Sequence, residues 1–536
     1  MLRLALLALI AALTGSLAQA QTPPVRIDSG LLQGVQDSDV VAYKGVPYAA
    51  PPVGPLRWRP PHPAPAWRGV RDASIFGPVC PQATGLGVPA SLPQSEDCLT
   101  LNVWAPAHAA GPAPVMVWLH GGGDDAGTAR QPQFDGAVFA RDGIVFVSVD
   151  YRLGALGWFA HPALTREAGP GAPLGDYGLM DEIAALTWVQ RNIRAFGGDP
   201  RQVTVAGESA GGEAVLFLMG APAARGLFAR AIVESGTGWA DYPTLAKAED
   251  EGVALATRAG APADADAAAL RALPVAALLA ANHGEIGEII DGRLVTADPA
   301  TIFAAGHAAA VPLLIGSNSG EDSLLGNSDP KDVLKDFTAD QLSALRAAYG
   351  AETPDDAALG RAVFRDQWMG APARWIAARQ SAHAPAWLYH FAYIPSILVG
   401  RRKAASHGFE MLFTFEALAR APIPLPASPA DMAEMTLLHG CWASFVKTGV
   451  PTCPGGPAWP GYSAASDTLM LFGQDTASGA SHFRAGPYDV LDRIEAERLK
   501  KPAPTGEAQL SRGRAELAHR DGRALGLAGR FGGVGR

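Results

Sequence analysis

Five short apolar runs recur along the chain, each separated from the next by polar or glycine-rich sequence. Runs made almost wholly of apolar residues are typical of strands buried on both faces of a parallel sheet. Residues 179–193 instead repeat apolar side chains at helical spacing, with Ile183, Leu186 and Val189 on one face. Strands that alternate with helices predict an α/β fold with a mostly parallel central sheet flanked by helices. The predicted strands are residues 115–119, 144–149, 203–206, 229–233 and 311–315.

Residues 21–498 are predicted to form one large domain around this sheet. Of the 536 residues, 48% are hydrophobic and 18% are charged, which suits a large buried core. The alanine-rich residues 245–310 and 328–385 predict helical excursions that cap the sheet and shape a pocket. From Lys500 onward there are eight basic and three acidic residues among many glycines, so residues 499–536 are predicted to be a disordered basic tail.

Residues 1–20 have the pattern of a signal peptide. Arg3 precedes an apolar run over residues 4–13, and Ala18 and Ala20 form a small-x-small cleavage site. A membrane anchor is the alternative, but the run is shorter than the ~20 residues of a membrane span. We therefore expect cleavage near Ala20, export to the periplasm or the medium, and no stable membrane insertion.

A nucleophile motif of the form G-x-S-x-G lies directly after the strand at 203–206. Gly207 and Gly211 flank Ser209, and a helical pattern begins at about Glu213. This strand–turn–helix context lets the backbone bend sharply and leaves the serine hydroxyl accessible at the carboxyl end of the sheet. The helix N-terminus behind it places amide groups near developing negative charge. Ser209 is therefore the candidate nucleophile.

A glycine run, residues 120–123, follows the strand at 115–119. Glycines there allow backbone N–H groups to turn toward an oxyanion with no side chain in the way. A flexible turn is the alternative, but the place of the run after a core strand and upstream of the nucleophile favours the oxyanion hypothesis. The candidate donors are the amides of Gly122, Gly123 and Ala210.

These motifs, with several others in the same order, resemble the type-B carboxylesterase family, whose members include acetylcholinesterase. The resemblance covers about residues 25–495. It rests on long blocks: residues 43–54, residues 95–103, Asp150-Tyr151-Arg152-Leu153-Gly154, residues 196–211 and Ala458-Trp459-Pro460. It implies an α/β-hydrolase fold and a serine esterase that needs no cofactor or metal.

The resemblance also implies the partners of Ser209. The segment 315–321 is similar to the loop that presents the catalytic acid of the family, which assigns that role to Glu321, with the neighbouring Asp322 as the alternative. The segment 406–410 is similar to the loop of the catalytic histidine, His407. The order serine, acid, histidine is the one this fold uses. Two supporting residues are expected beside the triad, namely Glu208 and Ser235.

The chain has four cysteines. Cysteines in an exported protein can be oxidised, and Cys80 and Cys98 both lie in loop-like sequence. These two match a disulfide of the family, so the resemblance implies that they pair. Cys441 and Cys453 could form a second bridge, but Cys441 lies in a helical pattern and could equally be a core residue.

Two features depart from the family pattern. Asp124 and Asp125 follow the glycine run, and carboxylates directed at an oxyanion would oppose catalysis, so we expect them to point away or to be hydrogen bonded. Arg401, Arg402 and Lys403 precede the histidine loop. They are either a solvated basic turn or a cluster at the pocket mouth that attracts esters bearing carboxylates.

The sequence therefore predicts a carboxylic ester hydrolase that acts on small to medium esters through an acyl-enzyme. No tryptophan lies between Cys80 and Cys98, where choline-binding relatives hold the cation, so choline esters are not expected. The net charge of −9 argues against a nucleic-acid partner. An acyltransferase or amidase could use the same triad, and a non-catalytic binding protein is a third alternative. The oligomeric state is not predicted.

Overall fold

The computed structural model describes residues 20–83, 88–283 and 287–500. The predicted leader, apart from Ala20, and residues 501–536 of the predicted tail lie outside these ranges. Helix α15 (Ala485–Lys500) continues through the first two residues that were assigned to the tail. Leu499 is helical because it packs against the apolar core together with Leu491 and Ile494.

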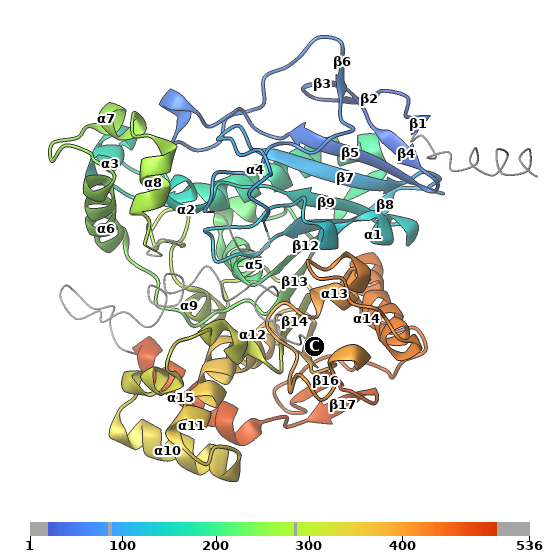
Figure 1. Ribbon diagram of the computed structural model, residues 1–536, viewed down its shortest axis with the longest axis vertical. Helices are drawn as coiled ribbons and strands as arrows, with labels where there is room; N and C mark the ends of the chain where they lie inside the picture. The colour runs from blue at the N-terminus through green and yellow to red at the C-terminus, as the bar shows by residue number, and fades with distance from the viewer. Residues whose placement is uncertain (1–19, 84–87, 284–286, 501–536) are drawn as a thin grey trace, which may run out of the picture.

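A sheet of twelve strands forms the centre of the molecule (Figure 1). The pairs from β9 through β8, β12, β13, β14 and β15 to β16 are parallel, and antiparallel strands flank them on both sides. In spatial order the strands are β1 (Ala20–Gln21), β4 (Val35–Asp37), β5 (Val40–Pro47), β7 (Thr100–Pro106), β9 (Val145–Val149), β8 (Ala113–Leu119), β12 (Gly198–Glu208), β13 (Arg230–Glu234), β14 (Leu313–Asn318), β15 (Ala386–Phe391), β16 (Thr468–Phe472) and β17 (Ala477–Ser481).

The predicted α/β fold with a mostly parallel sheet is confirmed. All five predicted strands lie in the sheet, with ends that differ by a few residues. Two small sheets accompany it. They contain β2 (Val25–Ile27), β3 (Gly30–Gln33) and β6 (Val70–Asp72), and β10 (Trp158–Phe159) and β11 (Gly175–Asp176).

Successive residues of the central strands belong to two different apolar cores. Val115, Val117 and Leu119 of β8 pack in one core, whereas Met116 and Trp118 pack in the other. Alternate side chains of a strand point to opposite faces of the sheet, so both faces are covered. This double burial is the physical reason that the strands read as unbroken apolar runs.

Helices cover the two faces and form two further groups. Helices α4 and α5 pack in the first core, and α1 and α14 pack in the second. Figure 1 shows α6, α7 and α8 grouped at the upper left and α10, α11 and α15 at the bottom. Helices α6, α7 and α8 lie in the predicted excursion 245–310, and α10 and α11 lie in the predicted excursion 328–385, whereas α15 belongs to neither. The helices other than α15 are α1 (Ala137–Arg141), α2 (Gly154–Gly157), α3 (Pro162–Ala168), α4 (Tyr177–Asn192), α5 (Ala210–Gly220), α6 (Leu245–Arg258), α7 (Ala267–Arg271), α8 (Val275–Ala281), α9 (Pro299–Ala304), α10 (Ala339–Tyr349), α11 (Asp356–Arg365), α12 (Ala371–Gln380), α13 (Met411–Thr414) and α14 (Pro429–Thr448).

Two disulfides are present. Cys80 pairs with Cys98, and Cys441 of α14 pairs with Cys453, which settles the alternative that the sequence left open. Among the described residues, no helix combines the length and the apolarity needed to span a bilayer.

A buried ion pair joins the segment after β9 to helix α4. Arg152 donates from Nε and Nη2 to the carboxylate of Asp181 at 2.8 Å, and its side chain is 3% exposed. Removing one partner of such a pair leaves an uncompensated charge in the interior.

We expect Arg152→Met to lower the free energy of unfolding by about 3–5 kcal/mol, because Asp181 would remain buried without its counter-ion. Chemical denaturation measures the change. The matched control is Arg346→Met, which breaks a pair with Asp356 on side chains that are 48% and 53% exposed and should change stability little. Equal effects of the two substitutions would contradict the expectation.

Candidate active site

Ser209 occupies the sharp turn between β12 and α5. Its backbone has φ 57° and ψ −126°, a conformation that side-chain-bearing residues rarely adopt. The N–H of Ser209 donates to the carbonyl of Glu234 at the end of β13, at 2.9 Å. A Cβ on Gly207 would come within 2.3 Å of the Gly211 carbonyl oxygen, so the turn closes only with glycine there. The motif is therefore folded as a strained turn that leaves Ser209 partly exposed.

The glycine run lies against this turn. A Cβ on Gly121 would lie 2.9 Å from Cβ of Ser209. Gly122 and Gly123 have φ of 126° and 64°, in the region that favours glycine, and Gly123 is exposed. Tyr151 fixes the start of the run, because its Oη donates to the carbonyl of His120 at 2.5 Å.

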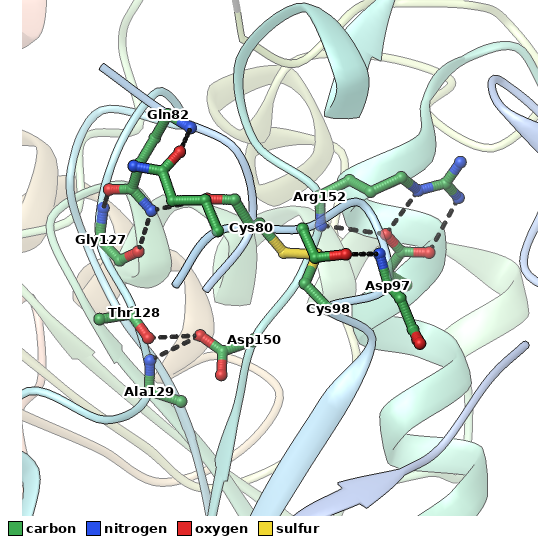
Figure 2. Close-up of a disulfide and its surroundings, with 12 residues drawn as sticks. Cys80, Gln82, Asp97, Cys98, Gly127, Thr128, Ala129, Asp150 and Arg152 are labelled. Carbon is green, nitrogen blue, oxygen red and sulfur yellow. Dashed lines mark hydrogen bonds and ion pairs between the residues drawn. A yellow bond between two sulfur atoms is a disulfide. The ribbon is translucent and has the colours of Figure 1, made fainter. Parts of the chain in front are cut away.

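The loop after the glycine run is held by side chains from distant segments. Gln82 makes two hydrogen bonds with the backbone of Gly127, of 2.8 and 2.9 Å, close to the Cys80–Cys98 disulfide (Figure 2). Asp125 accepts a hydrogen bond from Asn282 at 2.6 Å, as the sequence analysis anticipated.

Asp124 is buried and interacts with a residue of helix α4. Burial raises the pKa of Glu182 in that helix, and the charge of Asp124 raises it further. Asp124 is thus close enough to Glu182 for their charges to repel.

The structure brings His407 and Glu321 into direct contact. His407 Nδ1 lies 2.6 Å from Oε2 of Glu321. The other oxygen of Glu321 accepts from the Ser235 hydroxyl at 2.7 Å and from the Asn318 N–H at 2.6 Å. The imidazole therefore contacts Glu321, which is fully buried, and not the alternative Asp322.

The histidine loop is joined to the loop of the acid by backbone contacts. Gly320 pairs with Ser406 as an isolated bridge, and its N–H donates to Ala405 at 2.7 Å. The N–H of His407 donates to the Ser323 hydroxyl at 3.0 Å. These contacts fix the place of the imidazole relative to the strand that presents Glu321.

The second imidazole nitrogen lies beside the nucleophile turn. His407 Nε2 is 3.2 Å from Oε1 of Glu208, the residue before Ser209. The Ser209 hydroxyl makes no hydrogen bond to Nε2 in this structure. Free enzymes often hold this contact loosely until substrate binds.

Opposing effects set the charge of His407. Burial lowers the pKa of His407, but the carboxylates of Glu208 and Glu321 outweigh burial and raise it to about 9. Burial raises the pKa of Glu208 to about 7, against the lowering effect of His407. The imidazole and its acidic neighbours therefore titrate as a coupled group.

The structure places further residues at the site to which the sequence analysis assigned no role. Glu234, Glu410, Asn318 and Tyr389 are buried near Glu208 and Glu321. Glu410 lies three residues after His407, which is the only sequence signal for it. Glu234 directly precedes Ser235 in the chain.

The basic residues 401–403 lie on the same loop as His407. Arg402 donates from Nη1 to the Ser406 hydroxyl at 2.7 Å, next to His407 in the chain. Arg401 and Lys403 are exposed. In the described part of the chain, none of the three forms an ion pair.

Comparison with known proteins gives one consistent result. Residues 21–490 match the model of the carboxylesterase family. The chain is 35% identical to a fumonisin B1 esterase of Sphingopyxis macrogoltabida, over 86% of this chain and 89% of that protein. It is 34% identical to a para-nitrobenzyl esterase of Bacillus subtilis, over 82% and 93%. A solved carboxylesterase of Geobacillus stearothermophilus superimposes with a TM-score of 0.78 at 30% identity, covering 88% of this chain and 100% of that one.

The raised pKa of His407 predicts the pH dependence of the reaction. An imidazole that accepts a proton must be neutral, so kcat/KM should rise with pH. The midpoint of this rise, called the acid limb below, should lie above about pH 6.5, which is the ordinary pKa of histidine. Glu208→Gln removes a negative charge beside Nε2 and should move that limb to lower pH. Asp322→Asn is the control, because Asp322 does not contact His407. An unmoved limb in Glu208→Gln would contradict the electrostatic account.

Proposed function

Because the chain belongs to the carboxylesterase family and is a serine carboxylesterase, we propose that Ser209, His407 and Glu321 form its catalytic triad. The observation that carries this assignment is the 2.6 Å contact between His407 and Glu321, with Nε2 directed to the nucleophile turn beside Glu208. The resemblance to type-B carboxylesterases is confirmed by the family match, and it supports the same three residues.

In this mechanism His407 Nε2 takes the proton of Ser209 as Oγ attacks the ester carbonyl carbon. Glu321 holds the Nδ1 proton and stabilises the imidazolium that forms. The amides of Gly122, Gly123 and Ala210 stabilise the oxyanion of the tetrahedral intermediate. His407 then gives its proton to the leaving alkoxide, and an acyl group remains on Ser209. Water, deprotonated by His407, attacks the acyl carbonyl carbon. The bond to Ser209 Oγ then breaks, His407 returns its proton to Oγ, and the carboxylic acid is released.

The nature of the substrate follows from the family and the basic loop. We propose small to medium esters as substrates, with a preference for those that carry a carboxylate. The chain as a whole has a net charge of −9, yet residues 401–403 place three positive charges on the histidine loop without an ion-pair partner among the described residues. Such a local cluster would attract an anionic ester to the site.

We also propose that the protein is exported. The pattern of residues 1–20 is that of a cleavable leader, and the two disulfides are of the kind that persists in oxidising compartments.

Ser209→Ala should lower turnover of a neutral nitrophenyl ester by about 10⁴-fold or more, because the acyl-enzyme cannot form. The wild type should show a burst of nitrophenol equal to the enzyme concentration when deacylation is slow. The control is Ser381→Ala, which removes a hydroxyl that donates to the Ala378 carbonyl at the end of its own helix. Turnover that persists in Ser209→Ala would refute the triad.

Arg401→Gln combined with Lys403→Gln should raise KM for a nitrophenyl hemiester of a dicarboxylic acid several-fold and leave the neutral ester unchanged. Added salt should reduce the difference by screening. Arg26→Gln with Arg68→Gln removes two exposed charges near the small sheet of β2, β3 and β6 and serves as the control. An equal effect on neutral and anionic esters would show that the cluster does not select substrates.

A further inference from the structure

Glu234 links the nucleophile turn to helix α14 from within the core. Its carbonyl accepts the N–H of Ser209 at 2.9 Å, and its side-chain Oε1 accepts the indole N–H of Trp442 at 2.8 Å. The residue is fully buried. The next residue, Ser235, donates to Glu321, so two consecutive residues contact the two ends of the proposed triad.

Glu234 is surrounded by other buried acids rather than by cations. The titratable groups that act on it or on its neighbours come from β12, β15 and the histidine loop: Glu208, Tyr389 and Glu410, with Glu321 and His407 beyond them. In the described part of the chain, neither Glu234 nor Glu410 forms an ion pair with lysine or arginine. One side-chain oxygen of each of Glu208, Glu234, Glu410 and Tyr389 is buried without a hydrogen-bond partner among the described residues.

The four buried carboxylates of Glu208, Glu234, Glu321 and Glu410 interact with one another and share one imidazole, that of His407, so they cannot all be ionised at once. Each additional buried negative charge repels the others, and only His407 can balance one of them. Burial raises the pKa of Glu234 to about 8, with the Trp442 hydrogen bond lowering it and the charge of Glu208 raising it. Burial likewise raises the pKa of Glu410 well above its ordinary value.

We propose that Glu234 is a positioning residue for the charge around His407. Its buried carboxyl group has no lysine or arginine partner among the described residues and lies in a cluster with Glu208 and Glu410 beside the imidazole; it is the neutral member of that cluster, and its ionisation stabilises the protonated imidazole. The proposal rests on the triad proposed above. As a neutral acid Glu234 limits the negative charge near His407, so that the imidazole can lose its proton and act as a base. Once ionised, it adds a negative charge that holds the proton on His407.

The test is the pH profile of Glu234→Gln. Glutamine keeps the size of the side chain and an oxygen for Trp442, but it cannot ionise. The acid limb of kcat/KM should move to lower pH by about half a pH unit or more, while the rate on the alkaline plateau stays within about threefold of the wild type. Glu434→Gln is the matched control. Burial alone raises the pKa of Glu434 to about 7, whereas Glu234 interacts with Glu208 and Glu410, the two glutamates that act on His407 together with Glu321.

The outcomes of this test distinguish an electrostatic role of Glu234 from a purely structural one. A Glu234→Gln rate that falls by the same factor at every pH, with an unmoved limb, would reduce Glu234 to a structural role and overturn the proposal. Infrared difference spectra between neutral and alkaline pH should show a protonated carboxylic acid in the wild type that is missing from Glu234→Gln. If the variant does not fold, the absence of any such titrating acid in the wild type overturns the proposal. Ser209→Ala is run in parallel, since its activity tests the triad alone.

Discussion

Parallel strands that end in register hold this site together, because its groups stand at or just beyond the carboxyl ends of neighbouring strands. The pairing of β12 with β13 sets Glu208 opposite Glu234, and the pairing of β13 with β14 sets Glu234 opposite Gly316. Both faces of these strands are packed in apolar cores, so a slip of one residue would place every side chain on the wrong face. The geometry of the site is therefore a consequence of how the core is packed.

The histidine is the one member of the proposed triad that the sheet does not place directly. His407 lies beyond β15, and its loop is positioned by contacts to the loop that follows β14, through Gly320 and Ser323. The acid and the base are thus fixed to each other before substrate arrives. Such preorganisation removes the cost of arranging the two groups during the reaction.

The density of buried carboxylates is the distinctive electrostatic property of the site. In the proposed mechanism, the negative charges of Glu208 and Glu321 stabilise an imidazolium and so help the step in which His407 takes the serine proton. The same charges would hold His407 protonated if every neighbour were ionised. The raised pKa of Glu234 eases this conflict, because an acid that stays neutral adds no charge. Burial, which makes each charge costly, is what keeps the number of charges low.

The local pattern of residues in the sequence was enough to predict the central strands and the turn at Ser209. Apolar runs predict strands because both faces of the sheet are buried, and the glycines around Ser209 predict a sharp turn because a Cβ at Gly207 would clash. Tertiary structure decided what depends on contacts between distant residues. It selected Glu321 over Asp322 beside His407, paired Cys441 with Cys453, and extended α15 into the predicted tail by packing Leu499. It also gathered Glu234 and Glu410 with Glu208 into one cluster of buried acids beside His407, although Glu410 lies far from the other two in the chain. A sequence shows which residues are present, but burial and proximity, which set the charge of these acids, exist only in the folded molecule.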